Sequence, residues 1–213
     1  VTYTPFSLRL LHPHGPPLTL GGLGFGLASE LHPDLSYDPY WTYHEFLGAS
    51  APLPEGMVWA SVDRLISVEP IPPSEDTGDP TWALKVLLSE GTLATLTLSR
   101  SSTSSILLSL SLASGEDDRD EPYAAFGYWE APAREGENYY GLGESFDHVA
   151  RRGTYRAMGF QPILEAESGY NEGHIPVPLL ISTHGVGYFF ETYKPSYFDV
   201  AYTDDSVVRA EQS

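Results

Sequence analysis

The sequence predicts an all-β protein, built as an antiparallel β-sandwich with little helix. Short runs in which apolar and polar residues alternate recur along the chain, and this period is typical of half-buried strands. The 20 glycines and 18 prolines interrupt the chain too often for long helices. Hydrophobic residues make up 41% of the 213 positions, which is enough for the packed core of one domain.

The expected strands follow this alternation in chain order. In Ala94–Ser99 and Leu108–Leu112, apolar residues occupy one face and hydroxyl residues the other. The remaining expected strands are Thr4–Leu11, Met57–Val62, Leu65–Val68, Trp82–Leu88, Val177–Ser182, Val186–Phe190 and Phe198–Tyr202. Turn residues separate these runs at short intervals, and such regular spacing favours a sandwich.

The stretch from Gly21 to Pro54 is expected to be irregular. It begins with a glycine-rich run, Gly21–Gly26, which we interpret as a flexible turn. A phosphate-binding loop would need a Lys-Ser/Thr ending and a following helix, and this run has neither. A nucleotide site is therefore not predicted.

The charge is strongly acidic, with 29 Asp and Glu against 11 Lys and Arg and a net charge of −18. Such a surface repels nucleic acid and anionic membranes, so neither is expected as a partner. Much of the acidic excess lies in Glu75–Asp79 and Glu116–Glu121, which we interpret as solvated loop tips. Neither run has the ligand spacing of a known calcium loop.

Several kinds of site are not expected. The absence of cysteine excludes disulfides and thiolate metal sites, and His12-Pro13-His14 has no Asp or Glu at ligand spacing, so no metal or cofactor is predicted. There is no Gly-x-Ser-x-Gly motif of a serine hydrolase and no apolar run of membrane-spanning length. Since the sequence begins with Val1, we expect it to start inside a longer polypeptide. The compartment stays open, with an extracytoplasmic or secreted location slightly favoured.

The informative motifs lie between Asn138 and Val200. The first is Tyr139-Tyr140-Gly141-Leu142-Gly143-Glu144, followed by Arg151-Arg152-Gly153, then by Ile175–Ser182 and Gly185–Phe190. Gly141 and Gly143 are expected to permit close backbone approach or positive φ. Glu144 is either a buried orienting carboxylate or, in the interpretation we favour, the partner of Arg151 or Arg152 that fixes the turn. His184-Gly185 is expected to form a hairpin turn between two strands.

These motifs, in this order, resemble the N-terminal domain of glycoside hydrolase family 31, a β-sandwich of the galactose-mutarotase-like supersandwich type. The resemblance implies that residues 1–213 form a single sandwich domain. It also implies a longer enzyme whose (β/α)8 catalytic barrel is not in this chain. Gly141, Gly143, Glu144 and Arg152 are the expected structural motif residues.

The resemblance also implies a function for the parent protein. Family members are retaining α-glycosidases, or related transglycosylases and lyases, and retaining hydrolysis needs two carboxylates about 5 Å apart. In the family both carboxylates come from the barrel, so no catalytic residue is expected here and the chain alone is expected to be inactive. The expected partners are an α-glycoside carbohydrate substrate and the catalytic barrel of the same polypeptide.

The family's N-terminal domain lends one loop to the sugar pocket, which corresponds here to Met158–His174. Its polar side chains and one aromatic ring are candidates to bind sugar hydroxyls and stack on a ring. They are Gln161, Glu165, Glu167, Tyr170, Asn171, Glu172 and His174. Gln161 stands where some members have a sugar-contacting Asp, and it keeps hydrogen bonding without the charge. The sugar, and hydrolysis versus transfer, therefore stay open.

Three other interpretations compete with an accessory domain. A stand-alone carbohydrate-binding module would use an exposed aromatic platform, for which Tyr40, Trp41, Tyr43 and Trp59 are candidates. A sugar epimerase would need His148 or His174 with Glu144 as acid and base. A structural β-sandwich of unknown partner is the third. A module is expected to bind oligosaccharide alone, whereas an accessory domain should not and should expose an apolar patch for the barrel.

Overall fold

The computed structural model describes residues 7–11, 17–28, 57–72, 80–100, 105–112, 123–144, 148–158, 175–192 and 196–212. Within these ranges all regular secondary structure consists of β-strands, so the all-β class is confirmed. A search of the same ranges found no helix with the length and hydropathy needed to cross a membrane.

The strands are short to medium in length, apart from β4. In chain order they are β1 (Leu8–Leu10), β2 (Leu18–Leu20), β3 (Gly22–Ala28), β4 (Met57–Ile71), β5 (Thr81–Leu88), β6 (Leu93–Arg100), β7 (Ile106–Leu112), β8 (Tyr123–Pro132), β9 (Tyr139–Gly141), β10 (Thr154–Ala157), β11 (Leu179–Ser182), β12 (Gly187–Phe189), β13 (Ser196–Val200) and β14 (Val207–Gln212).

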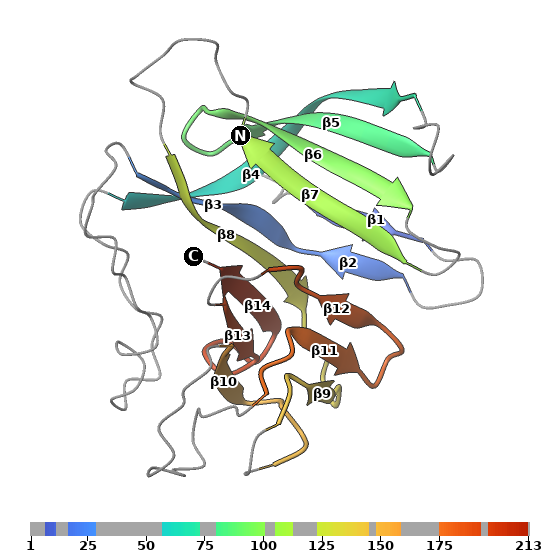
Figure 1. Ribbon diagram of the computed structural model, residues 1–213, viewed down its shortest axis with the longest axis vertical. Helices are drawn as coiled ribbons and strands as arrows, with labels where there is room; N and C mark the ends of the chain where they lie inside the picture. Colours follow the sequence, from blue (N-terminus) through green and yellow to red (C-terminus); the bar gives the residue numbers. More distant parts are fainter. Residues whose placement is uncertain are drawn as a thin grey trace.

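One nine-stranded antiparallel sheet runs through the described part of the molecule in the order β10-β13-β14-β8-β3-β4-β5-β6-β7. A three-stranded sheet, β12-β11-β9, and the β1-β2 pair complete it. Figure 1 shows β4 to β7 gathered at one end and β9 to β14 at the other, with the long strand β8 passing between them. Two layers of antiparallel strands are the expected sandwich arrangement.

The core divides into two clusters of buried side chains. The first lies on one face of β3 to β6 and includes Phe25, Val86 and Leu96. The second is formed where the three-stranded sheet and its loops meet β13 and β14, and it includes Leu180 and Phe198. Trp129 of β8 and Tyr188 of β12 pack against both clusters, so these two rings connect them.

The expected strands recur with shifted ends, and one pair of them is merged. Met57–Val62 and Leu65–Val68 were expected as two strands, but they belong to the single strand β4. The register with β5 shifts between Val62 and Arg64 and again between Leu65 and Ser67. Each such irregularity disrupts the alternation of side chains, and so a continuous strand gives the sequence pattern of two.

The glycine-rich run is the main correction to the sequence-based fold. Gly21–Gly26 was interpreted as a flexible turn, whereas β3 occupies Gly22–Ala28 at the centre of the nine-stranded sheet. Leu23, Phe25 and Leu27 alternate into the core, and the glycines lie on the opposite face. A Cβ at Gly24 would overlap the carbonyl oxygen of Ala60 and meet the ring of Tyr128, so the strand needs glycine there. The expected irregular range from residue 29 to 54 lies outside the described residues.

Candidate functional site at the base of the 159–174 segment

The side chains expected to contact sugar lie outside the described residues. They are Gln161, Glu165, Glu167, Tyr170, Asn171, Glu172 and His174. The structure describes the two ends of their segment, Met158 after β10 and Ile175 before β11. The site is therefore built here from the residues that hold these two ends.

The departing end is attached to the large sheet. β10 pairs with β13 from Thr154↔Val200 to Ala157↔Tyr197. Immediately after it, the N–H of Met158 donates to the carbonyl oxygen of Ser196 at 2.6 Å. The Met158 side chain then packs against the second core cluster. The chain thus leaves the sheet from a fixed position.

The returning end rests on the turn that follows β9. The N–H of Glu144 donates to the carbonyl oxygen of Ile175 at 3.1 Å, and that of Leu142 donates to Leu179 at 2.9 Å. Gly141 and Gly143 have φ of 115° and 81°, in the region that favours glycine. A Cβ at Gly141 would overlap the carbonyl oxygen of Leu179, and one at Gly143 that of Ile175. The close approach and positive φ expected from the sequence are both present.

Leu142, between the two glycines, also has a positive φ of 64°. A left-handed conformation costs a non-glycine residue roughly 1–2 kcal/mol. Its side chain is 1% exposed and belongs to the second core cluster. Burial of a leucine side chain contributes about 2 kcal/mol, which offsets that strain and fixes the turn to the core.

Arg151 attaches the next loop to this turn. Its side chain is almost fully buried, Nε donates to the carbonyl oxygen of Gly141 at 2.9 Å, and Nη1 donates to that of His148. Its backbone N–H donates to Tyr139 at 2.8 Å. Burial lowers the pKa of the Arg151 guanidinium. The carbonyl oxygens supply acceptors for a cation in this buried position.

Arg152 joins two further turns through its guanidinium. Nη1 donates to the carbonyl oxygens of Arg134 and Glu137 at 3.2 and 3.1 Å, and Nη2 donates to Asp205 at 2.6 Å. The Glu144 side chain is exposed, and between the described residues it forms no ion pair with either arginine. The pairing favoured for Glu144 is therefore wrong. Backbone carbonyls, which have no sequence signature, accept hydrogen bonds from both arginines.

Glu137 is a buried carboxylate that the sequence did not single out. It is 5% exposed, Ser182 Oγ donates to its Oε1, and the N–H of Arg134 donates to its Oε2 at 2.9 Å. His184 Nδ1 lies 3.4 Å from Oε1. Burial raises the pKa of Glu137, but the donors outweigh burial and the pKa is lowered overall. In the sequence, Glu137 differs from the exposed Glu135 only in that it follows Gly136, a turn residue.

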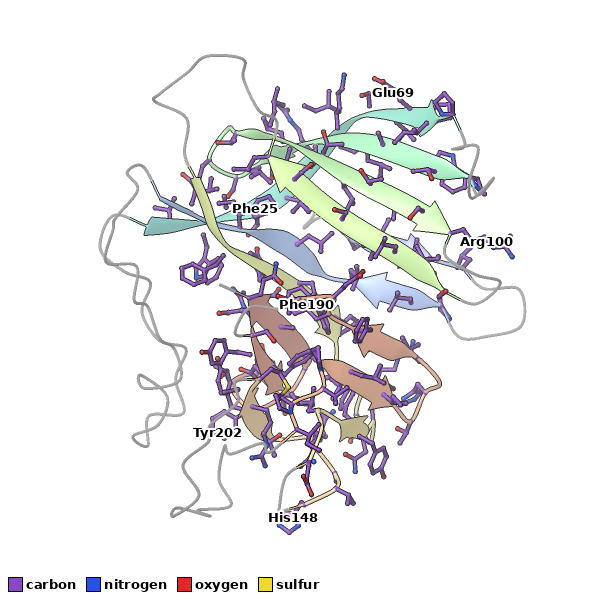
Figure 2. All side chains as sticks on the ribbon, in the orientation of Figure 1. Phe25, Glu69, Arg100, His148, Phe190 and Tyr202 are labelled. Carbon is purple, nitrogen blue, oxygen red and sulfur yellow. The ribbon has the colours of Figure 1, made fainter. Side chains whose placement is uncertain are left out.

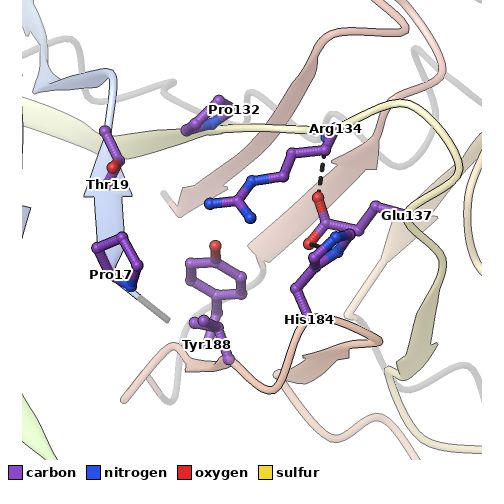
Figure 3. A pocket seen from close by; sticks show the side chains of 8 residues that line it. Pro17, Thr19, Pro132, Arg134, Glu137, His184 and Tyr188 are labelled. Atoms are coloured by element: carbon purple, nitrogen blue, oxygen red, sulfur yellow. Dashed lines mark hydrogen bonds and ion pairs between the residues drawn. The ribbon is translucent and has the colours of Figure 1, made fainter. Parts of the chain in front are cut away.

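A small polar pocket lies beside this carboxylate (Figure 3). It is lined by Pro17, Thr19, Pro132, Arg134, Glu137, His184, Val186 and Tyr188. Burial, with the negative charge of Glu137, raises the pKa of the Tyr188 hydroxyl to about 12. The lining can donate and accept hydrogen bonds, but it holds a single carboxylate. Retaining glycoside hydrolysis uses two carboxylates, and the described lining supplies one of them.

His184 occupies the predicted hairpin turn between β11 and β12. The N–H of Ser182 donates to Val186 at 2.8 Å across the turn, and Gly185 has a positive φ of 80°. The turn expected at His184-Gly185 is thus confirmed. The same turn brings His184 to the buried carboxylate, a contact that the sequence did not indicate.

The Trp59 ring, a candidate for the aromatic platform of a binding module, is in contact with two other side chains. The guanidinium carbon of Arg209 lies 4.6 Å from the Trp59 ring centroid, and Tyr128 meets that ring edge-on at 5.1 Å. Tyr40, Trp41 and Tyr43, the other platform candidates, lie outside the described residues.

The acid and base of the epimerase interpretation do not form a pocket in the described structure. His148, labelled at the lower end of the molecule in Figure 2, is exposed, as is Glu144. His174, the other candidate base, falls in the part of the chain that is not described. A search of the described ranges found no group of three His, Asp or Glu side chains arranged to hold a metal ion.

Comparison with solved structures relates the fold to known enzymes. A family 31 sulfoquinovosidase from E. rectale, in complex with an aza-sugar inhibitor, matches with a TM-score of 0.51 at 11% identity, over 99% of this chain and 30% of that chain. A cycloalternan-degrading enzyme from Trueperella pyogenes matches with a TM-score of 0.39 at 14% identity, over 97% of this chain and 28% of that chain. A Flavobacterium johnsoniae family 31 dextranase matches with a TM-score of 0.36 at 13% identity, over 97% of this chain and 23% of that chain. The chain thus spans less than a third of each.

A comparison with curated proteins found no match. The likeness to the sulfoquinovosidase, at 11% identity, supports the fold alone. A family model also matches part of the sequence: residues 129–199 match the model of the glycosyl hydrolase 31 N-terminal galactose mutarotase-like domain. That range holds β9 to β12, the turn at Gly141–Glu144 and both ends of the 159–174 segment. Over residues 129–199, this chain is therefore similar to the N-terminal galactose mutarotase-like domain of glycosyl hydrolase family 31.

Proposed function

We propose that this chain is the accessory N-terminal domain of a retaining α-glycosidase or α-transglucosylase. Residues 1–213 form one sandwich domain, which packs on a (β/α)8 catalytic barrel of the same polypeptide. The domain lends the segment Met158–His174 to the substrate pocket, and the reacting carboxylates belong to the barrel. The observation that carries the proposal is the closely packed base of that segment, where the turn Gly141–Glu144 contacts Ile175.

This base has the property that a substrate-contacting segment requires. Binding groups discriminate between substrates only when the elements that carry them are held in place. Met158 is bonded to β13, and Ile175 is bonded to a turn that is itself fixed by the buried Leu142 and Arg151. Both ends of the segment are thus attached to the packed part of the domain.

Within the segment, we assign sugar contacts to its polar and aromatic residues. Carboxylate and amide groups suit sugar hydroxyls, and a tyrosine ring suits the apolar face of a pyranose. The assigned residues are Gln161, Glu165, Glu167, Tyr170 and Asn171. In the longer enzyme, Gln161→Ala is expected to raise KM more than it lowers kcat, because the residue binds substrate without taking part in bond breaking.

Calorimetric titration of the 213-residue chain with maltose, isomaltose and xylosides tests the accessory role. No binding heat is expected with any of them, because the barrel completes the pocket. No turnover of aryl α-glycosides is expected either. Saturable heat would favour a stand-alone carbohydrate-binding module. Release of the aryl group by the chain alone would place the reacting carboxylates within it and overturn the proposal.

The gene sequence after Ser213 gives the second test. A (β/α)8 barrel with two inward-facing carboxylates at strand ends is expected to follow. An unrelated domain there would contradict the proposal even if the isolated chain bound no sugar.

A further inference from the structure

Among the strands that the structure describes, β7 forms one edge of the nine-stranded sheet, with β6 on its only paired side (Figure 1). Its sequence, Ile106–Leu112, contains no charged residue, proline or glycine. Its pairing with β6 has no register shift, so no bulge turns the edge away. Natural sheet edges are usually protected by at least one of these devices.

The opposite edge of the same sheet is different. β10 has four residues, Thr154–Ala157, and carries Arg156. A short strand with a charge is a poor template for another strand. On β7, Ile106 and Leu107 are 48% and 46% exposed. One edge of the sheet is therefore protected and the other is suited to pairing.

We propose that two copies of this chain associate by pairing their β7 strands antiparallel about Ser109, which joins their large sheets into one. The pairing follows from the strand's own sequence. With Ser109 opposite Ser109, Leu108 faces Leu110 and Ile106 faces Leu112 of the second copy. Residues directly opposite each other share a face. The apolar face of each β7 therefore continues into that of its partner.

A second copy can satisfy the register that the apolar face of β7 requires. Leu108, Leu110 and Leu112 already pack against the first core cluster. A shift by one residue would place serines of the partner on that apolar face, because side chains alternate with a period of two. A two-fold pairing about Ser109 avoids the shift and closes the assembly at two copies.

The ladder geometry also permits this pairing. The N–H of Leu88 donates to the carbonyl oxygen of Thr92, which sets the alternation along β5 and β6. The same alternation continues from β6 to β7. The N–H and C=O groups of Ser109 therefore point toward β6, and those of Leu108 and Leu110 point toward the open edge. Ser109 then occupies a non-hydrogen-bonded pair on the two-fold axis, where opposing Cα atoms lie about 4.5 Å apart.

The net charge of −18 opposes association, whereas β7 itself carries no charge. Added salt screens repulsion between the copies without weakening the apolar contact. Association is therefore expected to strengthen from low to physiological ionic strength. Sedimentation of the unmodified chain should show a mass that doubles with concentration. A monomer at all concentrations and salts, or a mass that grows beyond two copies, would overturn the proposal.

Because the chain has no cysteine, single-cysteine variants report the register directly. In Ser109→Cys the two thiols lie opposite each other at a separation suited to a disulfide, so mild oxidation should give a covalent dimer. Ser111→Cys is the matched control, since Ser111 is also exposed but faces Leu107 of the partner. We expect about ten-fold less cross-linking from it. Equal cross-linking of the two variants would contradict the assigned register.

A charge at the axis gives an independent measurement. Ser109→Lys sets two like charges directly opposite and should abolish the dimer. Glu135→Gln, at an exposed turn, changes the net charge by the same one unit and should leave the dimer intact. A dimer that survives Ser109→Lys would show that β7 is not the interface. None of these outcomes depends on the proposed role in a glycosidase.

Discussion

At Gly143 a backbone with positive φ and a carbonyl oxygen close to Cα occur together. Its φ is 81°, and the carbonyl oxygen of Ile175 occupies the place of a Cβ. Gly143→Ala is therefore expected to lower the free energy of unfolding by about 3 kcal/mol, from backbone strain and overpacking combined. Urea unfolding followed by circular dichroism measures the change.

Gly136 provides the matched control for that substitution. Its φ of 73° is similar, but no atom lies within 4 Å of the position of a Cβ. Gly136→Ala should cost about 1 kcal/mol, because only the left-handed conformation is unfavourable. If the two variants unfold at the same urea concentration, the contact with Ile175 has no energetic role.

Glu137 predicts a pH dependence of stability. Hydrogen bonds lower its pKa in the folded state below the ordinary 4.5, so its ionised form stabilises the fold. This contribution is fully present above the unfolded-state pKa and is lost as the pH falls through the folded-state pKa. At pH 7, Glu137→Gln is expected to cost roughly 2 kcal/mol, a value typical of hydrogen bonds to a charged group.

The comparison is made by urea unfolding of wild type and variant from pH 7 down into the acid range. The stability difference should shrink as Glu137 becomes protonated in the wild type. Glu135→Gln, at the neighbouring exposed turn position, should behave as the wild type at every pH. A difference for Glu137→Gln that stays constant with pH would contradict the assigned charge.

At the scale of elements, alternation predicted the strands with one polar and one apolar face. In β6, apolar residues alternate with hydroxyl residues, and the strand forms where it was expected. β14 was not predicted from the sequence because the charged residues Arg209 and Glu211 interrupt its apolar residues. Val208 and Ala210 are nevertheless fully buried. Arg209 pairs with Glu211 of the same strand and with Glu130 of β8. Pairing between distant strands leaves no local pattern in a sequence.

The candidate site was predictable to a similar extent. Two glycines around one leucine indicated the turn at Gly141–Gly143, because glycine is the residue that a positive φ favours. The main-chain carbonyls that accept hydrogen bonds from Arg151 and Arg152 could not be predicted, since they have no sequence signature. Glu137 was missed for a different reason: its donors are brought to it by turns whose geometry the sequence does not specify.

Arg209 joins β14 to β8 and β4 through its side chain. Nη1 lies 2.6 Å from Glu130, and Nε lies 2.5 Å from Glu211, while the guanidinium covers the rings of Trp59 and Tyr128. Burial raises the pKa of Glu211 even with Arg209 beside it. Without the cation both carboxylates lose their partner, so Arg209→Met should cost about 3 kcal/mol in thermal or urea unfolding.

Lys85 is the appropriate comparison for Arg209. It lies 3.5 Å from Glu69, and both side chains are more than half exposed. Lys85→Met should therefore change stability by less than about 0.5 kcal/mol. Equal costs for the two variants would mean that burial of the Arg209 pairs contributes nothing.

At the scale of the whole molecule, the two core clusters lie along a single large sheet. Among the described residues, their side-chain connection is the pair Trp129 and Tyr188, which packs against both clusters. The two rings stack with centroids 4.9 Å apart at 17°, and Trp129 also meets Phe198 edge-on at 6.3 Å. Coupling between the halves of the domain is therefore concentrated in a few aromatic contacts and in the ladder of β8.

Trp129→Ala is expected to separate the unfolding of the two clusters. Replacing a packed tryptophan by alanine costs about 3–5 kcal/mol, and here the lost contacts belong to both clusters. The wild type should unfold in one calorimetric transition whose van't Hoff and calorimetric enthalpies agree. In the variant the van't Hoff enthalpy should fall below the calorimetric value, because the clusters then melt at different temperatures. Trp82→Ala, which removes a ring that is 41% exposed, should keep a single transition. One sharp transition in Trp129→Ala would mean that the β8 ladder alone couples the two halves.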